Sequence, residues 1–286
     1  MKNEENIVMN VTADNGFSDL VADKAVGLTK SNNGKTMMEA MVISQERIAS
    51  DIYSMWIDAE VIAKRCKPGQ FVSLYTSDKS HLLPRPISIC EVKENAIRIV
   101  YRVSGSGTKE FSKYMANRYV RLMGPLGNGF PLANEKKTAM LIGGGIGIPP
   151  MLYLAKSLPG SIKIVAGYRD EMFLDDSLAA WGSVYVATED GKHGIKGTVI
   201  DAIKAHQLTA DVIYACGPKP MLKAVCDYSL TMGIEGYISL EERMACGIGA
   251  CLACVCKTDK KDSYTNVNNT RICKDGPVFP IGEVIL

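Results

Sequence analysis

Residues 139–150 read Ala139-Met140-Leu141-Ile142-Gly143-Gly144-Gly145-Ile146-Gly147-Ile148-Pro149-Pro150. The apolar run 139–142 predicts a buried strand, and the prolines suit the first turn of a helix over 150–158. Glycines at such a turn let a pyrophosphate approach the backbone, and the helix N-terminus adds partial positive charge. A plain strand-to-helix turn is the alternative, because the strict G-x-G-x-x-G spacing is missing. Four glycines exceed what a turn needs, so we predict nucleotide binding by Gly143, Gly144, Gly145 and Gly147.

The chain beyond this loop alternates short apolar runs with helical segments. We expect strands over 162–167, 184–187 and 211–215, and helices over 174–180, 199–206 and 220–232. Alternation of this kind indicates a doubly wound parallel sheet.

A second turn of this sheet carries Cys216-Gly217-Pro218, between a predicted strand and a predicted helix. Ligands of open α/β sheets bind at the carboxyl edge of the strands. We therefore predict that Gly217 and Pro218 contact the nucleotide and that Cys216, small and polarizable, lies against the nicotinamide as the catalytic residue. A buried structural cysteine is the alternative.

The type of nicotinamide nucleotide depends on Arg169, Asp170 and Glu171, which follow the strand 162–167. A carboxylate at this point would hold a ribose 2′-hydroxyl, whereas an arginine would accept a 2′-phosphate. The carboxylates outnumber the arginine, so the pattern favours NAD and leaves NADP open.

The chain before the glycine loop has a different pattern of predicted secondary structure. Residues 37–133 contain short predicted strands at 38–43, 52–57, 71–75, 87–91 and 96–103, punctuated by turn residues at 68–69, 93–95 and 124–127. Only 109–116 looks helical. Short strands at regular spacing predict a small antiparallel barrel.

Polar motifs of this barrel fit a flavin nucleotide. Arg85 offers a planar fork for a pyrophosphate, Ser88 a donor for a flavin ring nitrogen, and Gly107-Thr108 precede the predicted helix, where a phosphate can rest. A surface arginine and a plain helix cap are the alternatives. The order and proximity of the motifs favour flavin binding by Arg85, Ser88, Gly107 and Thr108.

Cysteines dominate the last part of the chain. Cys246, Cys251, Cys254 and the more distant Cys273 follow the C-x4-C-x2-C…C spacing of plant-type [2Fe–2S] clusters. Small residues between the first two let backbone N–H groups turn toward the sulfur atoms. A four-cysteine zinc site or free thiols are the alternatives, but zinc sites usually pair two short knuckles. Cys256 would point the same way as Cys254 on an extended strand, so it is an alternative ligand.

Composition limits the function. The chain has 286 residues, 47% of them hydrophobic, and a net charge of +2, which favours binding neither to nucleic acid nor to a membrane. Nine cysteines is an odd count, and four of them fit a cluster better than a disulfide framework. The acidic start is unlike a secretory signal, and we expect a cytoplasmic protein.

Taken together, these motifs resemble the ferredoxin–NADP reductase superfamily. With the cysteine motif and Cys273-Lys274-Asp275-Gly276-Pro277-Val278-Phe279, the chain is similar to the electron-transfer subunits of type B dihydroorotate dehydrogenases over residues 37–286. The expected domains are a flexible extension at 1–36, a FAD-binding barrel at 37–133, a NAD-binding α/β domain at 134–238 and a [2Fe–2S] domain at 239–286. The extension and Ala253, where many relatives carry glycine, depart from the family pattern.

This resemblance implies that FAD is bound in the barrel by the residues onto which the family's flavin motif maps: Arg85, Pro86, Ile87, Ser88, Val100, Tyr101, Arg102, Gly107 and Thr108. It also implies an FMN-containing catalytic partner subunit, in a hetero-oligomer with two copies of each. The partner would oxidise dihydroorotate to orotate in pyrimidine biosynthesis, and electrons would pass through the cluster and FAD to NAD⁺. No FMN or dihydroorotate site is legible in this sequence. The nearest alternatives are the small subunit of an NADH-dependent ferredoxin:NADP oxidoreductase, which tends to carry aspartate in place of Cys246, and a sulfhydrogenase flavin subunit. A zinc-stabilised nucleotide-binding regulator is an alternative of another class.

Overall fold

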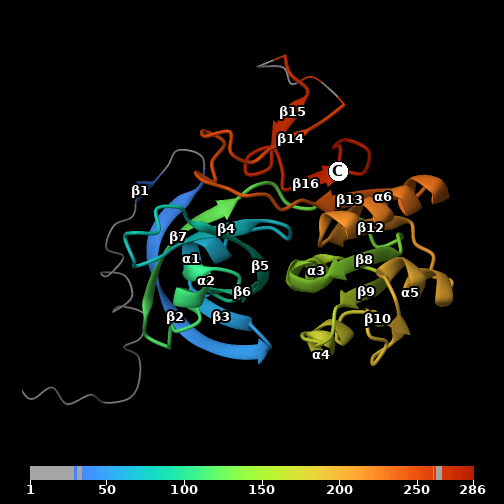
Figure 1. Cartoon of the computed structure of the whole chain (residues 1–286), viewed down its shortest axis with the longest axis horizontal. Coiled ribbons are helices and arrows are strands. Elements are labelled where there is room, and N and C mark those ends of the chain that lie inside the picture. The colour runs from blue at the N-terminus through green and yellow to red at the C-terminus, as the bar shows by residue number, and fades with distance from the viewer. Residues whose placement is uncertain (1–28, 31–33, 260, 262–265) are drawn as a thin grey trace, which may run out of the picture.

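The computed structural model describes residues 29–30, 34–259, 261 and 266–286. Figure 1 shows a barrel and an α/β sheet side by side, with the C-terminal segment running across both. Most of the expected extension 1–36 lies outside the described residues. Its described part includes β1 (Thr29–Lys30), which pairs with β2 (Thr36–Ala49).

The barrel is antiparallel and closed. Its strands are β2, β3 (Ile52–Asp58), β4 (Phe71–Tyr75), β5 (Arg85–Lys93), β6 (Ala96–Arg102) and β7 (Tyr119–Leu126). They pair in the order β2-β3-β6-β5-β4-β7, and pairing of β7 with β2 closes the ring. The sequence analysis missed β7, because it interpreted 124–127 as a turn. A Cβ at Gly124 would lie 2.7 Å from Val72 Cγ1, so this glycine lets β7 approach β4 closely.

Helices of the barrel also differ from the prediction. The expected helix 109–116 is α2 (Ser106–Phe111), which begins earlier because Gly105 serves as its N-cap, and α1 (Glu60–Ala63) was not predicted. Gly107 and Thr108 therefore lie inside the first turn of α2 instead of preceding it. Thr108 is not the cap itself, although its side chain bonds back to the Gly105 backbone.

The α/β sheet is parallel except at one edge. Its parallel strands are β8 (Ala139–Gly144), β9 (Ile162–Tyr168), β10 (Ser183–Thr188), β11 (Ile195–Lys196), β12 (Val212–Cys216) and β13 (Glu235–Ser239). The turn η1 (Gly145–Gly147) leads into the first of the helices α3 (Ile148–Ser157), α4 (Asp175–Ala179), α5 (Val199–Ala205) and α6 (Lys219–Met232). One buried cluster joins α3 and α4 to one face of the sheet, and another joins α5 and α6 to the opposite face. The doubly wound arrangement is thus as predicted.

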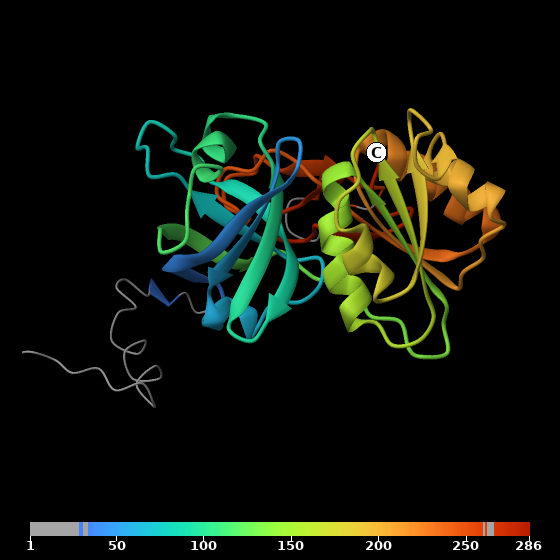
Figure 2. The same ribbon diagram turned by 90° about the horizontal axis from the view of Figure 1, so that it is seen from below.

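Two features position the site. The strands lie in the order β11-β10-β9-β8-β12-β13, so the chain order of neighbouring strands reverses between the parallel strands β8 and β12. Gly143 pairs with Cys216 at the carboxyl ends of these two strands. Open α/β sheets bind ligands at such a reversal. Figure 2 shows α3 facing the barrel, where Lys156 Nζ lies 2.5 Å from Glu91 Oε1 of β5.

The C-terminal segment connects both parts of the molecule. After β13 the chain forms the small hairpin β14 (Val255–Lys257) and β15 (Asn269–Arg271), then returns as β16 (Val278–Pro280) to pair antiparallel with β13. This edge strand of the sheet, β16, was not predicted from the sequence. None of the helices in the described part of the chain has the length and apolar character needed to span a bilayer.

Candidate functional site

A cavity of about 390 Å³ lies where the barrel, the glycine loop and the C-terminal segment meet. Its barrel wall contains nearly all the residues predicted for FAD: Arg85, Pro86, Ile87, Ser88, Val100, Tyr101, Arg102 and Thr108. These residues come from β5, β6 and α2, which the barrel places around one opening. The structure therefore brings the predicted motif together in space.

Arg85 is held across the first turn of α2. A Cβ added at Gly107 would lie 2.4 Å from Arg85 Nε, so the arginine side chain packs directly on this glycine. Arg85 Nη1 also donates to the carbonyl of Leu83. Thr108 Oγ1 accepts from the Ser104 and Gly105 amides at 3.0 and 3.2 Å and so closes the turn. The arginine fork and the helix turn together form a compact cationic corner at the cavity.

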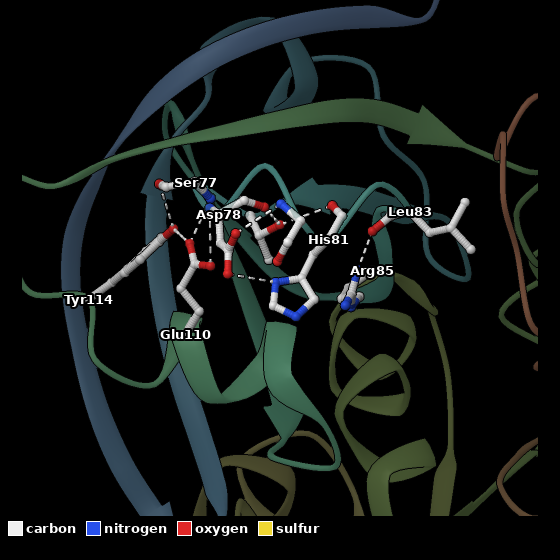
Figure 3. Close-up of polar contacts among 9 residues, drawn as sticks. Ser77, Asp78, His81, Leu83, Arg85, Glu110 and Tyr114 are labelled. Carbon is white, nitrogen blue, oxygen red and sulfur yellow. Dashed lines mark hydrogen bonds and ion pairs between the residues drawn. The ribbon is translucent and has the colours of Figure 1, made fainter.

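The loop between β4 and β5 is tied to α2 as well, as Figure 3 shows. Glu110 accepts from the Ser77 amide at 2.6 Å and from the Tyr114 hydroxyl at 2.6 Å. Burial opposes the charge of Glu110, but these donors hold the pKa of its carboxyl below the ordinary value. The contacts anchor the loop that leads into Arg85.

Other residues that line the cavity were not predicted from the sequence. They include Phe71 of β4, Ile146 of the glycine loop, Ser239 and Glu241 at the end of β13, and Pro277. Glu241 lines the cavity and is exposed to solvent, yet protein surrounds it closely enough that burial raises the pKa of its carboxyl. No local motif marks these residues, because each reaches the cavity from a different part of the chain.

The glycine loop and the Cys216-Gly217-Pro218 turn contact each other. A Cβ at Gly147 would lie 2.2 Å from the Cys216 carbonyl oxygen, and one at Gly144 would lie 2.4 Å from Met221 Sδ and 3.1 Å from Pro218 Cδ. Only glycine permits the approach of Gly147 to the Cys216 backbone and of Gly144 to these side chains. The predicted residues Gly143, Gly144, Gly145, Gly147, Gly217 and Pro218 thus form one surface at the carboxyl ends of β8 and β12.

Cys216 lies behind this surface. Its side chain is fully buried, next to Ser239, which hydrogen-bonds the sulfur. Burial raises the pKa of the Cys216 thiol, and the nearby charge of Glu241 raises it further. The thiol is therefore protonated at neutral pH. Ser239 and Glu241 line the cavity, whereas Cys216 does not.

The residues predicted to select the nucleotide are exposed, but they differ in their contacts. Glu171 Oε2 accepts from the Ser50 amide of the barrel at 2.5 Å, so this carboxylate is engaged in joining the two parts of the molecule. Asp170 accepts from the Glu171 amide at 2.8 Å and lies near Arg169 and Arg102. Asp170 is the carboxylate of this group that faces solvent beside the sheet edge.

The cysteine loop turns its backbone toward the sulfur atoms. Gly247 and Gly249 have left-handed φ angles of 70° and 86°, which favour glycine and help direct successive N–H groups inward. Cys246 Sγ accepts from the amides of Ile248, Ala250 and Cys251 at 3.4, 3.3 and 3.4 Å. The Gly249 amide donates to Cys273 Sγ at 3.0 Å. The Cys246 amide donates to Cys251 Sγ, and the Cys273 amide to Cys254 Sγ, each at 3.4 Å. All of the predicted ligands accept at least one such bond.

The amide donors favour thiolate character at Cys246. Burial opposes ionisation of Cys246, but the amides outweigh it and lower the pKa of the thiol to about 6. Within the described residues, no three His, Cys, Asp or Glu side chains are placed as ligands of a single metal ion. A [2Fe–2S] cluster takes its four thiolates as pairs on two irons.

Cys256 occupies a different position from the four predicted ligands. It lies in β14 opposite Thr270 and packs half-buried beneath the loop. Burial raises the pKa of the Cys256 thiol to about 11, and Glu242 and Cys254 act in the same direction. Burial raises the pKa of the Cys273 thiol as well, so the pKa does not distinguish Cys256 from the predicted ligand Cys273, whereas its place in β14 does.

Comparison with known proteins decides the family. Residues 241–285 match the model of the iron-sulfur cluster binding domain of dihydroorotate dehydrogenase B. The electron transfer subunit of dihydroorotate dehydrogenase B (NAD(+)) from Fusobacterium nucleatum subsp. nucleatum is 45% identical over 252 residues, which cover 83% of this chain and 94% of that protein. The subunit from Geobacillus sp. (strain WCH70) is 42% identical, covering 86% and 97%. The chain belongs to this family of electron-transfer subunits.

Solved structures agree with this fold. The NADH-dependent reduced ferredoxin-NADP oxidoreductase superposes with a TM-score of 0.77 at 28% identity, covering 86% of this chain and 89% of the other. A ferredoxin NADP+ reductase from Neisseria gonorrhoeae, solved with FAD and NADP, gives a TM-score of 0.58 at 16% identity over 72% and 94% of the two chains, a likeness of fold alone. The resemblance and the fold class predicted from the sequence are therefore confirmed.

Proposed function

We propose that this chain takes electrons from an FMN-containing catalytic subunit that oxidises dihydroorotate, and passes them through a [2Fe–2S] cluster and FAD to NAD⁺. The observation that carries the proposal is the single cavity where flavin motif, glycine loop and cysteine segment meet. Separate cofactors can exchange electrons only if the chain holds them close together, and this cavity joins all three segments.

Bound FAD would supply the conversion between the single electrons of a cluster and the electron pairs of a nicotinamide. The chain's own part is to bind and orient. We assign Arg85 and the first turn of α2 to the pyrophosphate, and Ser88 with 100–102 to the flavin side of the cavity. The glycine loop and the Cys216-Gly217-Pro218 turn are assigned to NAD, with Cys216 behind the nicotinamide. We propose that the functional units are residues 37–133 for FAD, 134–238 for NAD and 239–286 for the cluster.

The cysteine loop supports the cluster assignment. Its amides already donate to the sulfur atoms of Cys246, Cys251, Cys254 and Cys273, which suits a group that carries negative charge. Iron and acid-labile sulfide should each be present at about two per chain. Zinc without sulfide would contradict the cluster, and Cys256→Ser should leave the iron content unchanged.

Division of labour between subunits gives the decisive experiment. The purified chain, free of FMN, should oxidise NADH with an artificial electron acceptor but should not oxidise dihydroorotate. Adding the catalytic subunit should restore dihydroorotate-dependent reduction of NAD⁺. Cys216→Ala should slow reduction by NADH while FAD and iron contents stay at wild-type values. Dihydroorotate oxidation by the chain alone would refute the proposal.

The likeness to the NADH-dependent reduced ferredoxin-NADP oxidoreductase favours a second candidate, the small subunit of such an enzyme. Cys246 supports the first candidate, because that other subunit tends to carry aspartate at this position. Copurification from the native cell, with identification of the partner and analysis for FMN, separates the two.

A further inference from the structure

Strand β4 presents a row of side chains on the outside of the barrel. Val72 and Leu74 point into the barrel core, so Phe71, Ser73 and Tyr75 point outward, since strand residues alternate between faces. Ser73 is fully buried, and within the described part of the chain its hydroxyl has no hydrogen-bond partner. Burying an unpaired hydroxyl costs free energy, and native structures usually avoid it.

The cysteine loop covers this row. A Cβ at Gly247, the residue after Cys246, would lie 3.1 Å from Ser73 Oγ, so the hydroxyl faces the loop at contact distance. Tyr75, the next outward residue, has a pKa raised mainly by burial, and it is close enough to Cys246 for the charge of that thiol to act in the same direction. Phe71, at the other end of the row, packs in one buried cluster with Cys254 and Cys273. Ser73 therefore lies against the beginning of the cysteine loop.

We infer that the Ser73 hydroxyl donates a hydrogen bond to a sulfur at the Cys246 end of the bound cluster and raises its reduction potential. This inference rests on the cluster assignment of the proposed function. A bound cluster would bring sulfur acceptors to this loop, and one of them would give the unpaired Ser73 hydroxyl a hydrogen-bond partner. Reduction adds negative charge to the cluster, so a donor stabilises the reduced form more than the oxidised form.

The position of Ser73 gives this bond a role in electron transfer. Phe71, two residues earlier on the same face of β4, lines the flavin cavity. The strand thus contacts the flavin site and the cysteine loop through adjacent outward side chains. Raising the potential of the cluster favours its acceptance of electrons from the catalytic subunit before they reach the flavin.

The test compares reduction potentials in the cluster-loaded chain by titration followed with electron paramagnetic resonance. Ser73→Ala should shift the reduction equilibrium about tenfold toward the oxidised cluster, which equals about 59 mV for one electron. Ser73→Thr keeps the hydroxyl and should stay closer to wild type than to the alanine variant. Ser54→Ala is the matched control, because Ser54 is a buried barrel serine whose hydroxyl accepts from Arg98 Nε at 2.8 Å. It should leave the potential unchanged.

A second measurement uses the wild-type protein alone. Pulsed resonance spectra of the reduced cluster should contain a proton coupling that disappears after brief transfer to D2O, because a hydroxyl proton exchanges faster than buried amide protons. Absence of this coupling would overturn the inference even if Ser73→Ala failed to hold a cluster. An unchanged potential in Ser73→Ala, or an equal fall in Ser73→Thr, would also overturn it. Wild-type protein without iron and sulfide would instead refute the proposed function, and this inference with it.

Discussion

Arg85 illustrates how a single side chain is prepared for an anion. Its guanidinium packs on Gly107 and donates to the Leu83 carbonyl, so it is already placed beside the first turn of α2. Little rotamer freedom remains to be lost when a phosphate binds, which makes the contact stronger than that of a mobile surface arginine.

Arg85→Ala should weaken FAD binding by about 1.5–3 kcal/mol, because it removes a charge-assisted hydrogen bond to the pyrophosphate. Titration of flavin-free protein with FAD, followed by flavin fluorescence, measures the effect. Arg65→Ala removes an exposed arginine elsewhere on the barrel and serves as the control. Equal affinities in the wild type and the Arg85 variant would mean that the pyrophosphate lies elsewhere.

Glu241 should make stability depend on pH. Burial raises the pKa of its carboxyl above the ordinary value of 4.5, so the folded chain binds this proton more tightly than the unfolded chain does. The free energy of unfolding therefore falls as pH rises from about 4.5 through the raised pKa, and stays lower above it. Glu241→Gln removes this titration.

The variant should therefore gain stability relative to wild type as the pH rises above about 5. Denaturant unfolding of both proteins at several pH values up to about 8 measures the difference. Glu283→Gln, at an exposed glutamate near the C-terminus, is the control. A difference that stays constant across this pH range would show that Glu241 does not titrate as its surroundings require.

At the scale of elements, α5 depends on a reciprocal cap. The Asp201 amide donates to Thr198 Oγ1 at 3.3 Å, and Asp201 Oδ2 accepts from the Thr198 amide at 2.7 Å. The helix then packs Val199, Ala202 and Ile203 against the sheet. The cap fixes where this short helix begins.

Thr198→Ala should lower the free energy of unfolding by about 1 kcal/mol, the usual cost of removing an N-cap hydroxyl. Denaturant unfolding, followed by a spectroscopic signal from the α/β domain, measures this loss in the free energy of unfolding. Thr209→Ala, at an exposed threonine shortly after the end of α5, should have a much smaller effect. Equal losses from the two substitutions would contradict a specific role of the cap.

Elements differ in how well the sequence predicts them. Apart from the two-residue strand β11, which was not predicted, the helices and strands from β8 to α6 agree with prediction to within one or two residues, because apolar periodicity and the glycine and proline positions are local signals. Strand β7 was missed, since its Gly124 and Pro125 look like a turn until the barrel closes on them. β16 was missed because its pairing with β13 joins residues that are far apart in the chain.

At the scale of the whole molecule, the candidate site was only partly predictable. The arginine fork, the glycine loop and the cysteine spacing are local patterns with direct chemical reasons. Phe71, Glu241 and Pro277 become part of the flavin cavity only when the C-terminal segment crosses from the sheet to the barrel. The same crossing places Ser73 under the cysteine loop, a contact that no spacing in the sequence indicates.

Asn128 holds this crossing in place. Its Nδ2 donates to the carbonyls of Asp275 and Val278 at 3.0 and 2.8 Å, and its Oδ1 accepts from the Val278 amide at 2.9 Å. The side chain of one barrel residue thus fixes the segment between Cys273 and β16. These bonds link the cysteine segment mechanically to both the barrel and the sheet.

Asn128→Ala should lower the free energy of unfolding by about 1.5–4.5 kcal/mol, since two partly buried hydrogen bonds and one exposed hydrogen bond are lost at roughly 0.5–1.5 kcal/mol each. The loosened segment carries Cys273, so iron should also pass faster to an external chelator, which can be followed by the absorbance of the iron complex. Asn134→Ala, at an exposed asparagine whose Oδ1 accepts only the nearby Lys136 amide in the described part of the chain, should leave the rate unchanged. Iron release from the Asn128 variant at the wild-type rate would show that the cysteine loop keeps its ligands together without the barrel.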